Sequence, residues 1–169
     1  FYQSIGEVSH VSLVPTQLQR WFDYLVEHPQ PIKTQAVLLG GTQIPVKLTQ
    51  ALNELGIRSY SGYGMTEMAS TAFAKQSDGK IGVGQPLLGR EFKLVNEEVW
   101  LKGVGLAMGY WRDGRIEPLT NYEGWFQTKD KGQWLDNELV IRGRLDNMFI
   151  SGGENIQPEE IEKVIAQSD

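Results

Sequence analysis

The chain has 169 residues, 40% of them hydrophobic and 22% charged, a composition typical of a soluble globular protein of about one domain. Its net charge of -5, without a cluster of Lys and Arg, argues against nucleic acid as a partner, since phosphate backbones need a concentrated basic face. Cysteine is absent, which excludes disulfides, a thiol nucleophile and a cysteine-bound zinc, and no apolar run reaches the roughly 20 residues of a membrane span. We therefore expect a cytoplasmic protein with neither a membrane nor a nucleic-acid partner. A homo-oligomer is compatible with the sequence, which leaves the oligomeric state open.

Residues 8–75 alternate short apolar runs with helical periodicity. Three strands are expected, at residues 10–14, 37–39 and 57–61. A helix follows Pro15, with Thr16 as its expected N-cap, and a second helix opens at Pro45 and stops at Gly56. Strands joined by helices in this way predict a parallel sheet, which binds ligands in the loops at the carboxyl ends of its strands.

After residue 80 the pattern changes to alternating strands with glycine-rich turns. Strands are expected at residues 91–95, 98–101 and 138–141, and a last helix at Pro158. The fold class is therefore α/β, with a parallel β-α-β portion followed by a small antiparallel, β-barrel-like subdomain.

Two glycine-rich segments lie where predicted parallel strands end. They are Gly40-Gly41-Thr42, before Pro45, and Gly62-Tyr63-Gly64-Met65-Thr66-Glu67. The first has an ordinary explanation as a strand end before a helix start. The second could equally be a glycine turn before a helix capped by Thr66.

Charged residues and glycines recur in the second half of the chain. Asp130 ends the aromatic run Trp125-Phe126-Gln127-Thr128-Lys129-Asp130, which by itself could be a turn between two strands. Arg144 and Asp146 precede Gly152-Gly153. A tight turn before a helix explains the two glycines but not the charged residues at these spacings.

These segments, in this order and with the Gly-Tyr-Trp of residues 109–111, resemble the adenylate-forming superfamily of acyl-CoA synthetases, peptide-synthetase adenylation domains and luciferases. The resemblance implies that ATP, with Mg²⁺, activates a carboxylic acid as an acyl adenylate, which is then transferred to a thiol such as coenzyme A. A carboxylate is a poor electrophile, and transfer to AMP creates the leaving group that it lacks.

The resemblance also implies a role for each matching residue. Tyr63 stacks on adenine. Thr66 and Glu67 are the catalytic residues, of which Thr66 contacts the α-phosphate and Glu67 binds Mg²⁺. By the same resemblance, the nucleotide is bound by Gly40, Gly41, Thr42, Gly62 and Gly64, and its ribose by Asp130 and Arg144. Asp146 is the hinge, and Gly152 and Gly153 lie beside the pantetheine arm of coenzyme A. Thr16 and Gln17 line the acyl pocket. Lys129 departs from the pattern, because glycine is common there.

Within the superfamily, residues 12–17, 96–100 and Asp146-Asn147 look most like the bacterial 2-succinylbenzoate-CoA ligases of menaquinone synthesis. Three parts are then expected: 1–79 as the end of the large domain, 80–143 as the β-subdomain, and 144–169 as the hinge and the start of a mobile C-terminal domain. The family's phosphate loop would precede Phe1 and its catalytic lysine would follow Asp169. We thus expect the isolated chain to be inactive, which measurable ATP-pyrophosphate exchange would contradict.

Three other functions remain open at this stage. The chain could come from another aryl- or acyl-CoA ligase, from an adenylation domain that loads a carrier protein, or from a non-catalytic binding module.

Overall fold

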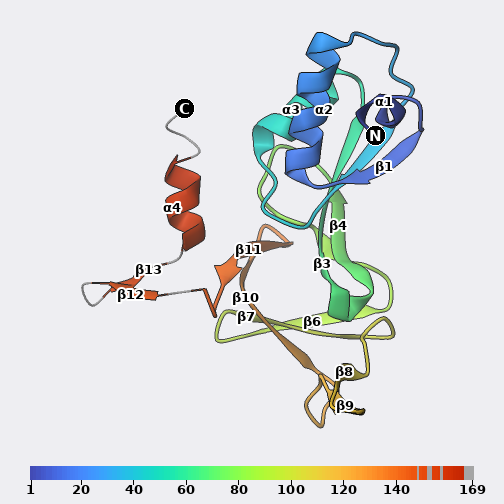
Figure 1. The fold of residues 1–169 in the computed structure, drawn as a ribbon. Coiled ribbons are helices and arrows are strands. Elements are labelled where there is room, and N and C mark those ends of the chain that lie inside the picture. The colour runs from blue at the N-terminus through green and yellow to red at the C-terminus, as the bar shows by residue number, and fades with distance from the viewer. Residues whose placement is uncertain (148, 152–153, 157, 166–169) are drawn as a thin grey trace. The chain divides into compact units, whose positions relative to one another are not determined.

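A computed structural model describes residues 1–147, 149–151, 154–156 and 158–165. They form two compact units, Phe1–Leu87 and Leu88–Asp169 (Figure 1). The division therefore falls between Leu87 and Leu88, whereas the boundaries expected at 79/80 and 143/144 stay predictions.

The first unit is an α/β sheet structure. Its elements are α1 (Tyr2–Ile5), β1 (His10–Leu13), α2 (Pro15–Glu27), β2 (Ala36–Leu39), α3 (Val46–Glu54), β3 (Arg58–Met65), the 3-10 helix η1 (Thr66–Met68), β4 (Ser70–Gln76) and β5 (Gln85–Pro86). The strand order is β1-β2-β3-β4-β5. Strands β1, β2 and β3 are parallel, with α2 and α3 as crossovers, which confirms the predicted β-α-β arrangement.

The core of this unit lies between the parallel strands and the helices. Alternation along β2 places Val37 and Leu39 on the face that packs with Leu18 and Trp21 of α2, and all four side chains are fully buried. Each such side chain contributes roughly 1.5–3 kcal/mol by leaving water. The core therefore holds the strand ends in a fixed register.

Helix α2 begins two residues earlier than the predicted cap requires. Its N-cap is Val14, and Pro15 is its first residue, where the missing N–H of proline is harmless. The Gln17 side-chain oxygen accepts a hydrogen bond from the Val14 N–H at 3.0 Å. The prediction that Thr16 is the N-cap is therefore wrong.

Strand β3 is longer than predicted and includes most of the second glycine segment. It continues to Met65 because β4 pairs with it antiparallel, Gly64 lying opposite Thr71 and Met65 opposite Ser70. Thr66 then opens a short 3-10 helix whose N-cap is Met65. The alternative of a glycine turn before a helix capped by Thr66 is thus wrong, since a tertiary partner extends the strand.

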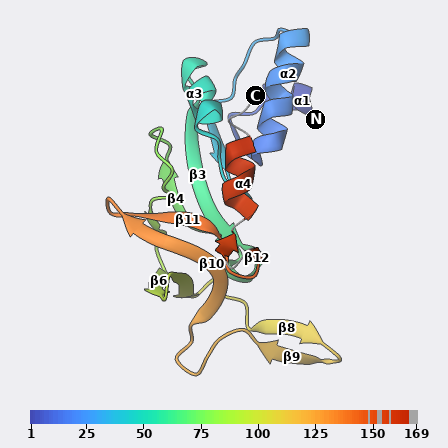
Figure 2. The ribbon, with the colours of Figure 1, turned by 90° about the vertical axis from the view of Figure 1, so that its left-hand side faces the viewer.

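The second unit is mainly antiparallel. Its elements are β6 (Arg90–Val95), β7 (Glu98–Gly103), β8 (Gly109–Arg112), β9 (Arg115–Pro118), β10 (Phe126–Leu135), β11 (Glu138–Arg144), β12 (Phe149–Ser151), β13 (Glu154–Ile156) and α4 (Pro158–Ile165). The main sheet has the order β11-β10-β7-β6. Strands β8 and β9 form a separate hairpin (Figure 2).

The structure confirms the α/β fold class and the antiparallel character of the second part. Among the described residues the four-stranded sheet has two ends, β6 and β11, so it is open and not a closed barrel. Of the helices that the structure describes, in either unit, none has the length and apolarity needed to cross a bilayer.

Candidate functional site

A cavity of about 550 Å³ lies in the first unit at the carboxyl ends of β1, β2 and β3. Its lining includes Gly40 and Gly41 after β2 and Gly62, Gly64 and Thr66 at the end of β3. The two glycine segments, about twenty residues apart in sequence, thus meet at the edge where open α/β sheets bind ligands.

Close approach of the strands explains why these positions are glycine. A Cβ on Gly40 would lie 3.2 Å from the Gly62 carbonyl oxygen, and Gly41 has a left-handed φ of 85°. A Cβ on Gly64 would overlap the Ser70 carbonyl oxygen and lie 2.7 Å from the Thr71 Cα. At these glycines the cavity wall is therefore bare backbone, which a ligand can approach closely.

The polar groups on the cavity wall are neutral. Hydroxyls come from Ser12, Thr66, Ser70 and Thr71, and an amide from Gln17. Of the described residues that line this cavity, none is charged. An anionic ligand here would meet hydroxyls and peptide groups, while its charge would have to be balanced from outside the cavity.

The backbone at the edge of the cavity adopts a strained path. Ala69, which follows η1, and Ser70, the first residue of β4, have φ values of 53° and 103°. Positive φ values are uncommon outside glycine and cluster at ligand sites. This turn carries the Ser70 hydroxyl to the cavity.

Four predicted site residues of the first unit are not among the residues that line this cavity. These are Tyr63, Glu67, Thr16 and Thr42. The Tyr63 ring packs beside the buried Phe73, with centroids 6.0 Å apart, as expected if strand alternation turns Tyr63 away from Gly62 and Gly64. Thr16 and Thr42 are exposed, and Glu67 is half-buried. The roles predicted for these residues stay predictions.

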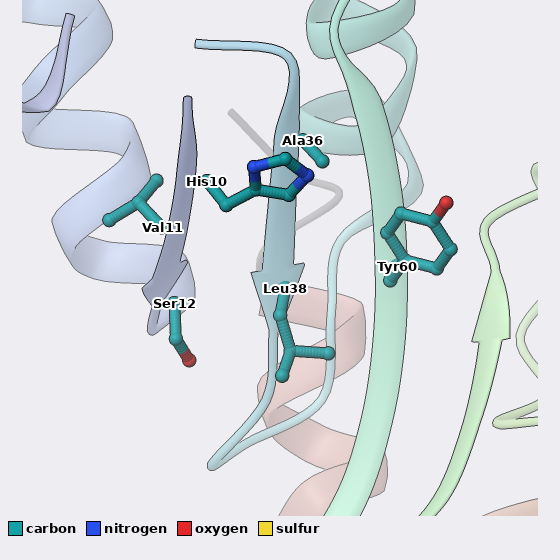
Figure 3. Close-up of a pocket in the computed structure, with 6 residues that line it drawn as sticks. All are labelled: His10, Val11, Ser12, Ala36, Leu38 and Tyr60. Carbon is teal, nitrogen blue, oxygen red and sulfur yellow. The ribbon is translucent and has the colours of Figure 1, made fainter. Parts of the chain in front are cut away.

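A smaller hollow of about 280 Å³ lies on one face of the same sheet. Figure 3 shows its lining side chains on three adjacent strands, with His10 on β1, Leu38 on β2 and Tyr60 on β3. Ser12 and Leu38 border both this hollow and the larger cavity. The hollow therefore adjoins the larger cavity along β1 and β2.

In the second unit, one arginine binds two carboxylates. Asp130 on β10 lies opposite Arg144 on β11, and the Arg144 Nη1 donates to the Asp130 Oδ1 at 3.3 Å. The Nε and Nη2 of Arg144 donate to the two oxygens of Asp146, each at 2.8 Å. The structure thus brings together three of the predicted site residues.

The two carboxylates differ in burial. Asp130 is 7% exposed and lies inside β10, so the alternative that it is a turn residue between two strands is wrong. Asp146 is exposed, and the hydrogen bonds from Arg144 lower its pKa below the ordinary value of 3.8, while slight burial opposes the shift. Asp146 is therefore ionised at neutral pH.

Lys129 occupies a backbone conformation that favours glycine. Its φ is 64°, in the left-handed region. This accounts physically for glycine being common at the matching position of the adenylate-forming family. Gly152 and Gly153 lie outside the described residues, so their predicted place beside the pantetheine arm stays a prediction.

Sequence reasoning missed the hydroxyls of Ser12, Ser70 and Thr71. Ser12 could have been found, because it lies in the second half of the short parallel strand β1, close to its carboxyl end. Ser70 and Thr71 could not, since only the pairing of β4 with β3 brings them to the cavity.

Comparison with known proteins supplies an independent observation. Residues 6–111 match the family described as AMP-binding enzyme. Across 168 residues, the chain is 69% identical to the 2-succinylbenzoate-CoA ligase of Haemophilus influenzae, a match that covers 99% of this chain and 37% of the relative.

Solved structures agree with the sequence match. A variant of Escherichia coli MenE with bound OSB-AMS aligns with a TM-score of 0.89 and 53% identity, over 98% of this chain and 36% of that one. The o-succinylbenzoate coenzyme A synthetase of Bacillus subtilis, in complex with ATP and magnesium ion, aligns with a TM-score of 0.78 and 31% identity, over 96% and 38%. The chain spans little more than a third of the length of these relatives.

Proposed function

The chain belongs to the family of AMP-binding enzymes, and from this premise we propose that it is part of an ATP-dependent ligase that joins 2-succinylbenzoate to coenzyme A. The supporting observation is 69% identity, over nearly the whole chain, to the 2-succinylbenzoate-CoA ligase of Haemophilus influenzae. Such a ligase would serve menaquinone synthesis. Its cytoplasmic location stays a prediction from the sequence.

The proposed reaction has two steps. In the first, a carboxylate oxygen of the acid attacks the α-phosphorus of ATP, and pyrophosphate leaves. In the second, the thiol of coenzyme A attacks the acyl carbonyl carbon, the thioester forms, and AMP leaves. The site must therefore hold a nucleotide in both steps and admit a thiol only in the second.

The cavity of the first unit suits the nucleotide. Its volume of about 550 Å³ falls within the roughly 300–1,000 Å³ that small-molecule sites occupy. Peptide groups exposed by Gly40 and Gly64, together with the Thr66 hydroxyl, would hold the phosphate and the nucleotide without crowding. We assign Tyr63 to adenine, and Thr16 and Gln17 to the acyl pocket.

Charge balance would come from Mg²⁺ held by Glu67. When bound, Mg²⁺ neutralises phosphate oxygens and polarises the phosphorus. The described residues contain no cluster of three or more ligating side chains. A single carboxylate from this chain suits Mg²⁺, which commonly binds through one or two carboxylates with phosphates and water.

The second unit would hold the ribose and the hinge. Asp130, a buried carboxylate, accepts hydrogen bonds and would bind the ribose hydroxyls, and Arg144 would donate to them from the opposite strand. Asp146 would be the hinge about which a C-terminal domain turns between the two steps. Gly152 and Gly153 would leave room for the pantetheine arm.

The proposal is tested in the full-length enzyme by measuring the AMP and the thioester formed from 2-succinylbenzoate, ATP and coenzyme A. Glu67→Ala should lower kcat by about 10²–10³, the loss typical when one electrostatic contact to a transition state is removed. Asp130→Ala should mainly raise the KM for ATP. The control Glu54→Ala changes an exposed glutamate at the end of α3 and should leave both parameters unchanged.

The alternatives make different predictions in the same assay. A ligase for another acid would form thioester with that acid but not with 2-succinylbenzoate. An adenylation domain would transfer the acyl group to a phosphopantetheine-carrying protein and not to free coenzyme A. A non-catalytic module would show no binding of an acyl-AMP mimic by calorimetry.

A further inference from the structure

Strand β10 bulges where it carries Asp130. Gln127 pairs with Trp100 of β7, and Lys131 pairs with Glu98, with a register shift between them. Thr128, Lys129 and Asp130 therefore lie opposite Val99 alone. Bulges of this kind re-aim side chains beside active sites, but they leave backbone N–H groups without ladder partners.

Two side chains accept hydrogen bonds from the N–H groups of this bulge. The Thr128 hydroxyl accepts from the Asp130 N–H at 3.0 Å and donates to the Val99 carbonyl oxygen at 2.7 Å. The Glu98 Oε1 accepts from the Lys129 N–H at 3.0 Å. The Lys129 carbonyl oxygen also accepts from the Leu145 N–H at 2.7 Å, so both peptide groups of Lys129 are held.

Glu98 is built into the unit and is not a surface charge. Its side chain is 12% exposed, and its Oε2 accepts from the Trp100 indole N–H at 3.0 Å. The Lys129 Nζ lies 3.8 Å from Oε1, which partly balances the buried charge. A hydrogen bond to a carboxylate is roughly twice as strong as a neutral one. Glu98 can therefore hold Lys129 at its unfavourable φ of 64°.

We propose that Glu98 is a positioning residue for the ligase reaction. By anchoring the Lys129 peptide group, Glu98 fixes the bulge of β10 that directs the Asp130 carboxylate toward the nucleotide ribose. This inference rests on the proposed function, because it requires Asp130 to bind the ribose. Glu98 acts through Asp130.

The test compares ATP with 2′-deoxy-ATP and 3′-deoxy-ATP in the full-length enzyme. The readout is the ratio of kcat/KM for ATP to kcat/KM for each analogue, which measures recognition of one ribose hydroxyl. The Asp130→Ala variant gives the lowest value expected for this ratio, because it lacks the carboxylate that is proposed to bind the ribose. Glu98→Ala should lower at least one of the ratios about tenfold toward that value, since a hydrogen bond to a charged group is worth about that factor or more. A general loss of structure would instead lower kcat/KM for all three nucleotides equally.

Glu98→Gln separates the hydrogen bond from the charge. The Lys129 N–H and the Trp100 indole donate to different oxygens of Glu98, and an amide keeps an acceptor at only one of these two positions. The ratio should fall in Glu98→Gln and recover in the double variant Glu98→Gln with Trp100→Phe, which removes the competing indole donor. If Glu98→Ala fails to fold, these two variants still test whether Glu98 positions Asp130.

Glu97→Gln is the matched control. Its side chain is 68% exposed and lies 3.3 Å from the Lys131 Nζ, and its removal should leave the ribose ratios unchanged. The positioning role is refuted if Asp130→Ala lowers the ratio while Glu98→Ala and Glu98→Gln retain the wild-type value. If Asp130→Ala itself leaves the ratio unchanged, the assignment of Asp130 to the ribose fails, and the role of Glu98 fails with it.

Discussion

Replacing Gly64 with alanine tests whether the close pairing of β3 and β4 holds the cavity together. The added Cβ would overlap the Ser70 carbonyl oxygen and lie 2.6 Å from its carbonyl carbon. These are backbone atoms, so no side chain can rotate away, and the two strands must separate. Because Gly64 pairs with Thr71 and Met65 with Ser70, separation weakens the end of this ladder.

The expected loss of stability follows from three contributions. Overpacking against rigid neighbours costs about 1–3 kcal/mol. Weakening one backbone hydrogen bond adds about 1 kcal/mol. Alanine recovers about 0.5–1 kcal/mol, because it loses less conformational entropy than glycine on folding. The net expectation is a loss of about 1–3.5 kcal/mol in the free energy of unfolding of the first unit.

Urea unfolding of the chain, followed by circular dichroism, measures this loss, and hydrogen exchange of peptides from residues 58–76 locates it. Gly56→Ala is the control, since φ is 74° there and no atom lies within 4 Å of the added Cβ. That variant carries only the left-handed backbone penalty and should lose about 1 kcal/mol or less. A Gly64→Ala variant no less stable than Gly56→Ala, or without faster exchange in β3 and β4, would refute this reasoning.

Two further predictions concern the second unit. Arg144 lowers the pKa of Asp146, so ionised Asp146 adds stability above its ordinary pKa of 3.8, and this stability is lost as the pH falls through the lowered value. Asp146→Asn should therefore be less stable than wild type at pH 7 by under about 1 kcal/mol. Thermal unfolding should show this difference in stability disappearing between about pH 5 and pH 2, and also in high salt. A difference that grows toward acid pH would contradict the prediction. At Lys129, both Ala and Gly remove the ion pair with Glu98, so their difference isolates the φ of 64°. Lys129→Gly should be up to about 1 kcal/mol more stable than Lys129→Ala in urea titration, and the reverse order would exclude backbone strain at this residue.

Local patterns predicted the parallel half of the fold well. Helical spacing behind Pro15 and Pro45, with apolar runs between, was sufficient to place β1, β2 and both crossover helices. Such signals are local, because a proline start or an apolar stripe acts through residues a few positions apart. The strand pattern after residue 80 likewise indicated β6, β7 and β11.

The errors arose where a partner distant in sequence decides the local structure. The glycines around Tyr63 could form a turn or a strand, and only pairing with β4 makes them a strand. Asp130 could lie in a turn, and only pairing with Arg144 of β11 keeps it inside β10. The Thr16 error has a local cause instead, because the Gln17 side chain accepts a hydrogen bond from the Val14 N–H three residues earlier and the cap lies at Val14.

The sequence alone determined the class of the fold, the order of the glycine and charged segments, and hence the family resemblance, because these depend on residue identity and on spacing along the chain. The tertiary structure decided which of those residues meet. It brought Gly40 beside Gly62, joined Arg144 to Asp130 and Asp146, and bonded the Glu98 side chain to the Lys129 N–H in the β10 bulge. These contacts depend on strand register, which is fixed by burial of one face of each sheet and is not written in any single segment.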